Sequence, residues 1–67
     1  MKARDLADMS FDELDQTERE LKRKLFNLRF QRATSELSNT AELGKTKKDI
    51  ARVMTVTRQK MAQEAGA

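Results

Sequence analysis

No proline interrupts the 67-residue sequence, and of its two glycines only Gly44 lies away from the end of the chain. Proline and glycine are the residues that most disfavour a helix interior, so this chain has few places where a helix must stop. Glu, Lys, Arg, Leu, Ala, Met and Gln dominate the rest and are good helix formers. No apolar–polar alternation of useful length indicates a strand. The sequence therefore predicts an all-α protein.

A capping motif marks the start of the first long helix. Ser10 is followed three residues later by Glu13, the spacing of a capping box. Acidic residues fill the next turn, where the positive end of a helix favours carboxylates. We therefore expect a helix over about residues 10–34, preceded by a short helical turn over residues 2–7.

A polar stretch separates this helix from a second one. Residues 35–39 are turn-prone, and Asn39 with Glu42 resembles another cap, so a second helix is expected over about residues 40–63. A short link between two long helices makes them antiparallel. The expected fold is a single domain over residues 1–67, a long antiparallel two-helix hairpin.

Apolar residues form stripes at helical spacing. The stripe of the first helix comprises Phe11, Leu14, Leu21, Leu25 and Leu28. The apolar face of the second helix comprises Leu43, Ile50, Val53, Met54, Thr57 and Met61, with Thr46 in line. We expect the leucines from 21 to 28 to face the apolar residues from 50 to 57 across the seam.

The first helix carries a second stripe about 100° around from the first, taking ~100° per residue. Its members are Phe26, Phe30, Ala33 and Leu37. Stripes of this kind are usually core, but a two-helix protein has only one partner helix to cover two of them. Phe26 and Phe30 are therefore the candidate protein-contact residues.

Several classes of function lack the residues they need. There is no His or Cys, which removes the commonest general base and the thiolate zinc sites. The acidic residues 5–15 lack the spacing and glycine of a calcium loop, and no glycine-rich phosphate loop or apolar membrane span occurs. We expect a cytoplasmic protein that is not an enzyme and needs no metal, cofactor, membrane or small-molecule substrate.

The charge is distributed unevenly. Residues 1–20 carry three basic and seven acidic side chains, whereas residues 21–67 carry eleven basic and four acidic ones. In the hairpin, Arg29 and Arg32 are expected to lie close to the lysines at 45, 47 and 48, a cluster that would attract phosphate. The alternative is a solvated helical surface with pairs such as Lys45–Asp49.

Two main functional hypotheses follow. One is a structural hairpin that binds RNA through this cluster. The other is a coiled-coil module that binds a partner helix through the second stripe. A helix-turn-helix DNA reader is a third, but the expected helices are too long for its short, steeply crossing pair.

Two segments carry a resemblance to a known family. They are residues 26–31, Phe-Asn-Leu-Arg-Phe-Gln, and residues 47–55, Lys-Lys-Asp-Ile-Ala-Arg-Val-Met-Thr. At this spacing and length the chain resembles the bacterial type of the large-subunit ribosomal protein twenty-nine family. Gly44 stands where the family commonly has a basic residue.

The resemblance implies a helical hairpin in the large ribosomal subunit of the cytoplasm. It implies binding to large-subunit ribosomal RNA near the exit tunnel, beside large-subunit protein twenty-three and close to where chaperones and targeting factors dock. The positions that it implies for RNA contact are Arg29, Gln31, Lys47, Lys48 and Arg52; charge alone adds Arg32 and Lys45. The acidic first twenty residues are expected to point away from RNA.

Overall fold

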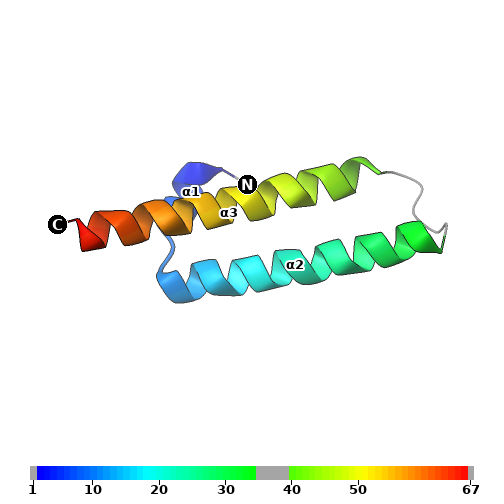
Figure 1. Cartoon of the computed structure of the whole chain (residues 1–67), viewed down its shortest axis with the longest axis horizontal. Coiled ribbons are helices and arrows are strands. Elements are labelled where there is room, and N and C mark those ends of the chain that lie inside the picture. Colours follow the sequence, from blue (N-terminus) through cyan, green and yellow to red (C-terminus); the bar gives the residue numbers. More distant parts are fainter. Residues whose placement is uncertain (1, 35–39, 67) are drawn as a thin grey trace.

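The fold is an antiparallel helical hairpin with a short helix packed on one side (Figure 1). The computed structural model describes residues 2–34 and 40–66. Within them the helices are α1 (Ala3–Ala7), α2 (Phe11–Ala33) and α3 (Ala41–Ala65). The molecule measures 49 × 17 × 15 Å. The all-α hairpin with a short N-terminal helix is confirmed.

The predicted connection between the long helices lies outside the described residues. It comprises residues 35–39, with the Asn39 cap and the Leu37 member of the second stripe. At its C-terminal end, helix α3 continues to Ala65, two residues past the helix end expected at residue 63.

The start of α2 is fixed by Ser10, as its spacing to Glu13 predicts. The Ser10 hydroxyl oxygen accepts a hydrogen bond from the Glu13 backbone N–H at 3.2 Å. It also donates to the Glu13 carboxylate, at 3.2 Å. In a full capping box that carboxylate would accept from the cap backbone N–H instead. The cap therefore forms, with a different partner for the glutamate.

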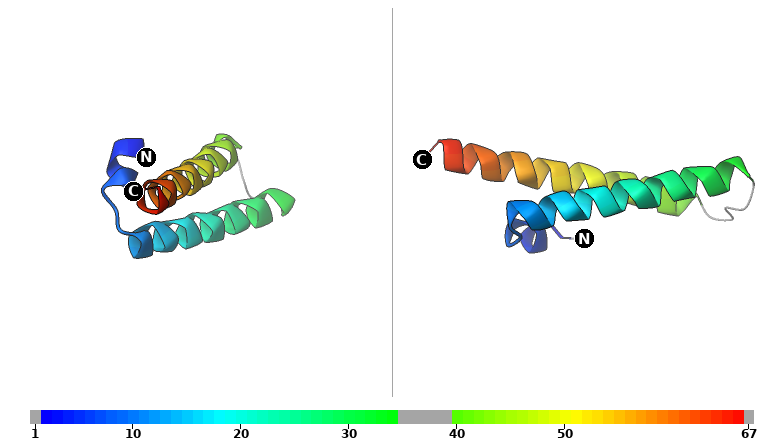
Figure 2. Two further views of the ribbon diagram at one scale, coloured as in Figure 1. Left: turned by 60° about the vertical axis from the view of Figure 1, so that its left-hand side comes forward. Right: turned by 90° about the horizontal axis from the view of Figure 1, so that it is seen from below.

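The best-packed part of the core joins all three helices. Leu6 of α1 and Leu14 of α2 are fully buried with Val53 of α3, and Val56 completes the cluster. Figure 2 shows how α1 folds back to lie against α3. Val56 is missing from the predicted apolar face, because it lies on the side of α3 that α1 covers rather than in the seam with α2.

The pairing across the seam differs from the one expected. Val53 packs with Leu14, and Thr57 lies with Phe11 and Leu14 at the first turns of α2. The expectation placed these α3 residues opposite the leucines from 21 to 28. Leu21 does pack against the cluster that contains Val53, but the first turns of α2 lie at the level of Val53 and Thr57, so the expected register is wrong by more than one helical turn. Helical periodicity fixes which face of a helix is apolar, but it leaves the axial register free. Here α1 packs against α3, and its Leu6 joins Leu14 and Val53 in one buried cluster.

Candidate nucleic-acid interface

The uneven distribution of charge in the sequence persists along the folded rod. Residues 21–52, from the middle of α2 through the bend to the middle of α3, carry nine basic and three acidic side chains. The remaining residues meet at the opposite end, because the end of α3 lies beside the start of α2 (Figure 1). They carry five basic and eight acidic side chains. Basic side chains thus predominate from the bend to the middle of α3, and the opposite end, called the acidic end here, contains the carboxylates of the first turns of α2 and of the last turns of α3.

The predicted RNA-contact residues of α2 all lie exposed in its last turns. They are Arg29, Gln31 and Arg32. Taking about 100° per residue, Gln31 and Arg32 lie within about 60° of the line of the buried Leu28, one on either side. Arg29 lies about 100° from it. These side chains therefore surround the tip of α2 and do not form a row.

The predicted residues of α3 are also exposed, and most of them share one face. Lys45, Lys48 and Arg52 fall within about 60° of one another around the helix. Lys48 and Arg52 line a shallow hollow of about 410 Å³ between α1 and α3. Lys47 lies about 100° around from Lys48. The α3 group thus presents three cations on one side and one on another.

The two groups are farther apart than the sequence indicated. The ion pair between Lys24 Nζ and Glu42 Oε2, at 3.6 Å, shows which parts of α2 and α3 lie side by side. Arg29 lies five residues nearer the bend than Lys24, and Lys48 lies six residues farther from it than Glu42. At about 1.5 Å per residue, the levels of Arg29 and Lys48 are separated by about 16 Å. The basic surface is therefore a band along the rod and not a compact cluster.

Ion pairs leave most of this band unneutralised. The ion pairs between described residues are Arg19–Asp15 at 3.1 Å, Lys22–Glu18 at 3.6 Å and the Lys24–Glu42 pair. None of them uses the predicted RNA-contact residues from 29 to 48, and the alternative pair Lys45–Asp49 is not among them. The side chains in these pairs are largely exposed, where such pairs contribute about 0–1 kcal/mol.

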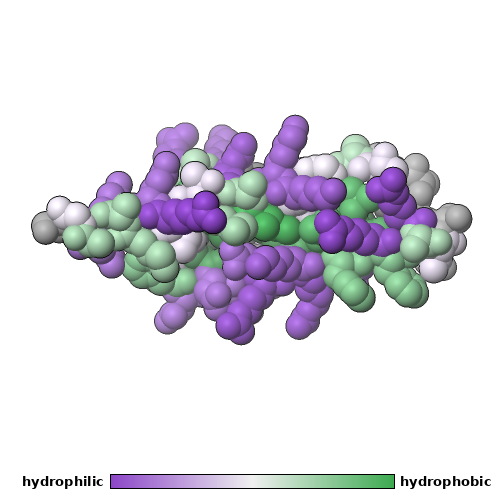
Figure 3. Space-filling view, viewed as in Figure 1, coloured by the Kyte–Doolittle hydropathy of each residue, from purple (hydrophilic) through white to green (hydrophobic). Residues whose placement is uncertain are grey.

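The second apolar stripe faces away from the other helix. Phe26 is 69% exposed and Phe30 is 61% exposed. Each lies about 160° around α2 from Leu28, which is buried in the seam. Figure 3 shows hydrophobic side chains on the outer edge of α2 near the bend, beside hydrophilic ones along both helices. The two rings are free to contact another molecule.

Residues 2–34 and 40–66 contain no group of three acidic side chains that could hold a metal ion. No helix in that part of the chain combines the length and apolar character needed to cross a bilayer.

Comparison with known proteins identifies the family. The family model for ribosomal L29 protein matches residues 4–60, most of the chain. The chain belongs to the ribosomal L29 protein family. Ribosomal L29 proteins are structural components of the large ribosomal subunit and not enzymes, which confirms the expected family and the expected lack of catalysis.

Individual relatives agree across nearly the whole length. The large ribosomal subunit protein uL29 of Sulfurihydrogenibium sp. (strain YO3AOP1) is 53% identical over 60 residues, covering 90% of each chain. That of Syntrophotalea carbinolica is also 53% identical, over 90% of this chain and 97% of its own. That of Lactobacillus acidophilus is 48% identical over 90% and 92%. The match to L29 proteins is therefore not confined to one motif.

Proposed function

We propose that the chain is a structural constituent of the large subunit of the cytoplasmic ribosome that binds large-subunit ribosomal RNA near the polypeptide exit tunnel. The observation that carries the RNA contact is the basic band, with its exposed cations on both long helices. The contact residues proposed are Arg29, Gln31, Arg32, Lys45, Lys47, Lys48 and Arg52. Membership of the L29 family supports the ribosomal setting.

The mechanism is binding without a reaction. Lys and Arg side chains neutralise phosphates and release the counterions condensed on RNA, which drives association. Arginine can also form paired hydrogen bonds to a phosphate. The exposed cations of α2 and α3 are separated by about 16 Å along the axis of the rod. The protein therefore suits an extended RNA surface better than a single phosphate. Structured RNA is read mostly by shape and backbone, so little base-specific contact is expected.

Protein neighbours are part of the same proposal. Large-subunit protein twenty-three is the proposed neighbour, with chaperones or targeting factors at the exit site. The exposed Phe26 and Phe30 are the proposed protein contacts on this side of α2, since burial of such rings would remove apolar surface from water. They lie on the outer edge of the hairpin, so a neighbour can reach them without disturbing the seam.

The exposure of Phe26 and Phe30 also favours the second candidate function, a coiled-coil module that binds a partner helix. The two candidates differ in their response to salt. In a plot of the logarithm of the association constant against the logarithm of the salt concentration, each phosphate contact adds roughly −0.7 to −0.9 to the slope. Binding by apolar burial shows little salt dependence. A steep slope with a large-subunit RNA fragment supports RNA binding, and a flat slope supports the coiled-coil function.

The proposed RNA contact is tested by the double variant Lys47→Ala with Lys48→Ala. Both side chains are exposed, so helicity by circular dichroism should be unchanged, while affinity for the RNA fragment should fall several-fold in filter binding. The matched control is Arg4→Ala with Arg58→Ala, which removes the same charge at the acidic end. Equal losses in the two variants, or no loss in the first, would contradict the proposed contact residues.

A further inference from the structure

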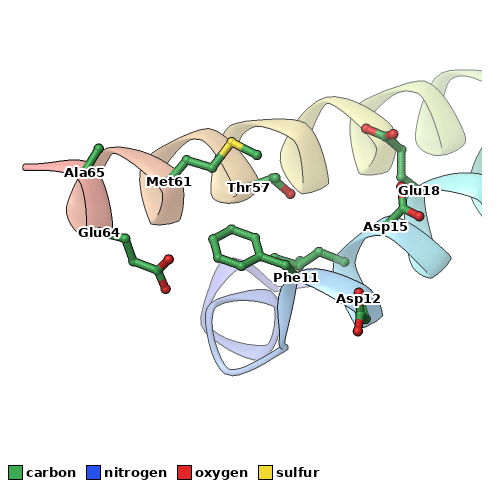
Figure 4. A pocket seen from close by; sticks show the side chains of 9 residues that line it. Phe11, Asp12, Asp15, Glu18, Thr57, Met61, Glu64 and Ala65 are labelled. Carbon is green, nitrogen blue, oxygen red and sulfur yellow. The ribbon is translucent and has the colours of Figure 1, made fainter.

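The acidic end of the rod contains an apolar groove. It lies between the first turns of α2 and the last turns of α3 and has a volume of about 680 Å³. Leu14, which is fully buried, forms part of its lining. Figure 4 shows Phe11 below Met61 and Thr57, with the aromatic ring turned into the gap between the helices. Met61 is 57% exposed, so this part of the seam is open.

The groove is open because of the register described above. Helix α3 continues past the start of α2, and Phe11 is the first residue of α2. Phe11 and Met61 therefore have no partner helix on one side. The Lys60 ammonium lies 5.2 Å from the centre of the Phe11 ring and donates to the Met9 carbonyl, which fixes the ring from the α1 side. The groove is thus a formed feature with one fixed wall.

Carboxylates surround this apolar surface. Asp12, Asp15, Glu18 and Glu64 all line the groove. Asp15 and Glu18 are paired with Arg19 and Lys22, in exposed or half-exposed pairs. Neither Asp12 nor Glu64 forms an ion pair with a described residue. The rim therefore keeps a net negative charge, which repels phosphate and favours a cation-bearing partner.

We propose that this groove is a docking site for a basic amphipathic segment of another protein. An apolar side chain of that segment would lie between Phe11 and Met61, and lysines or arginines would lie opposite Asp12 and Glu64. A trough between two helices suits a helix that inserts its apolar face. The four carboxylates argue against RNA and against anionic lipid as occupants. The proposal uses none of the RNA-contact residues, so it stands or falls independently of the proposed function.

The test uses a labelled amphipathic helical peptide with leucines on one face and lysines flanking them. Binding to the full chain is measured by fluorescence anisotropy. Met61→Ser removes an apolar wall that the fold does not bury and should weaken binding roughly tenfold, the equivalent of one buried apolar side chain. Asp12→Asn with Glu64→Lys should weaken it several-fold, and more so at low salt.

The matched control is Glu20→Lys, which reverses one exposed charge of α2 that does not line the groove. Its peptide affinity should stay close to that of the unaltered chain. An equal loss of peptide affinity in this control would show that the peptide is attracted by the overall negative charge of this end, and would overturn the proposal. Equal binding of a peptide with glutamates in place of lysines would overturn it too, as would no binding at all.

Other occupants give distinct results. Sedimentation that shows a dimer abolished by Met61→Ser would assign the groove to a second copy of the chain and overturn the proposal. Weaker binding of the RNA fragment by the Met61→Ser variant would assign the groove to RNA and would also overturn the proposal. Retained RNA affinity together with lost peptide affinity supports the groove as a protein-docking site. A failure of the Lys47 and Lys48 test would leave this result untouched.

Discussion

Thr46 is the side chain whose chemistry fits its surroundings least. It is 1% exposed, and its hydroxyl oxygen has no hydrogen-bond partner among the described residues. A buried polar group without a partner costs about 1–3 kcal/mol. Valine has nearly the same shape and keeps the branching at Cβ, so Thr46→Val should raise the free energy of unfolding by about 1 kcal/mol. Urea denaturation followed by circular dichroism measures the change.

A second threonine of α3 provides the control. The Thr57 hydroxyl donates to the Val53 carbonyl at 2.8 Å and is only partly buried. Thr57→Val therefore gives up a hydrogen bond and should bring no gain in stability. A Thr46→Val variant that unfolds at lower urea than the unaltered chain would contradict this account of Thr46.

At the scale of the element, local signals were the reliable ones. The Ser10 cap was predictable because it depends on residues three positions apart, and helix type was predictable because the chain contains almost no helix breaker. The hydrogen-bond partner of the Glu13 carboxylate was not predictable, since it depends on side-chain geometry at a single turn. The continuation of α3 to Ala65 also escaped prediction, because no breaker marks its end before Gly66.

Gly44 weakens α3 without any packing reason. It is exposed, and a Cβ built on it meets nothing within 4 Å. Gly44→Ala should therefore stabilise the chain by about 0.5–1 kcal/mol by restricting the unfolded backbone. The expected readouts are a higher helix content and a higher thermal midpoint by circular dichroism.

Gly66 is the matched control for this substitution. A Cβ there would lie 3.0 Å from the Ala62 carbonyl oxygen, at the very end of the helix. Gly66→Ala should give no comparable gain. An equal rise in thermal midpoint for both variants would mean that the position in the helix does not matter, contrary to the argument.

At the scale of the whole molecule, the sequence could not reveal how the helices are placed along one another. Periodicity showed the two apolar faces but not the register, and the five residues of α1 carry too weak a pattern to predict its docking on α3. For the same reason the basic surface was expected as a cluster and is observed as a band. The groove at the acidic end was also missed, because Phe11 and Met61 read as ordinary members of the seam.

The packing of α1 in the core gives a prediction for the stability of the chain in the absence of RNA. Leu6 is 0% exposed and lies at the junction of all three helices. Leu6→Ala should cost about 2–5 kcal/mol, which is comparable to the whole stability of a domain this small. The isolated variant should therefore lose much of its helical circular dichroism signal. Addition of the large-subunit RNA fragment should restore part of it, since ligand binding favours the folded state.

A variant that keeps its full helical signal without RNA would show that α1 is dispensable for the hairpin. The conservative change Leu6→Met, which preserves side-chain volume, should cost less than about 1.5 kcal/mol and serves as the control.

The packing of Leu6 against Val56 also bears on when the protein matures during its synthesis. These two side chains are about fifty positions apart in the sequence, and the earlier one must wait until the later one has been translated and has left the ribosome that makes it. The nascent chain therefore cannot complete its core in stages. The three helices can pack together only when α1, α2 and most of α3 have all been translated.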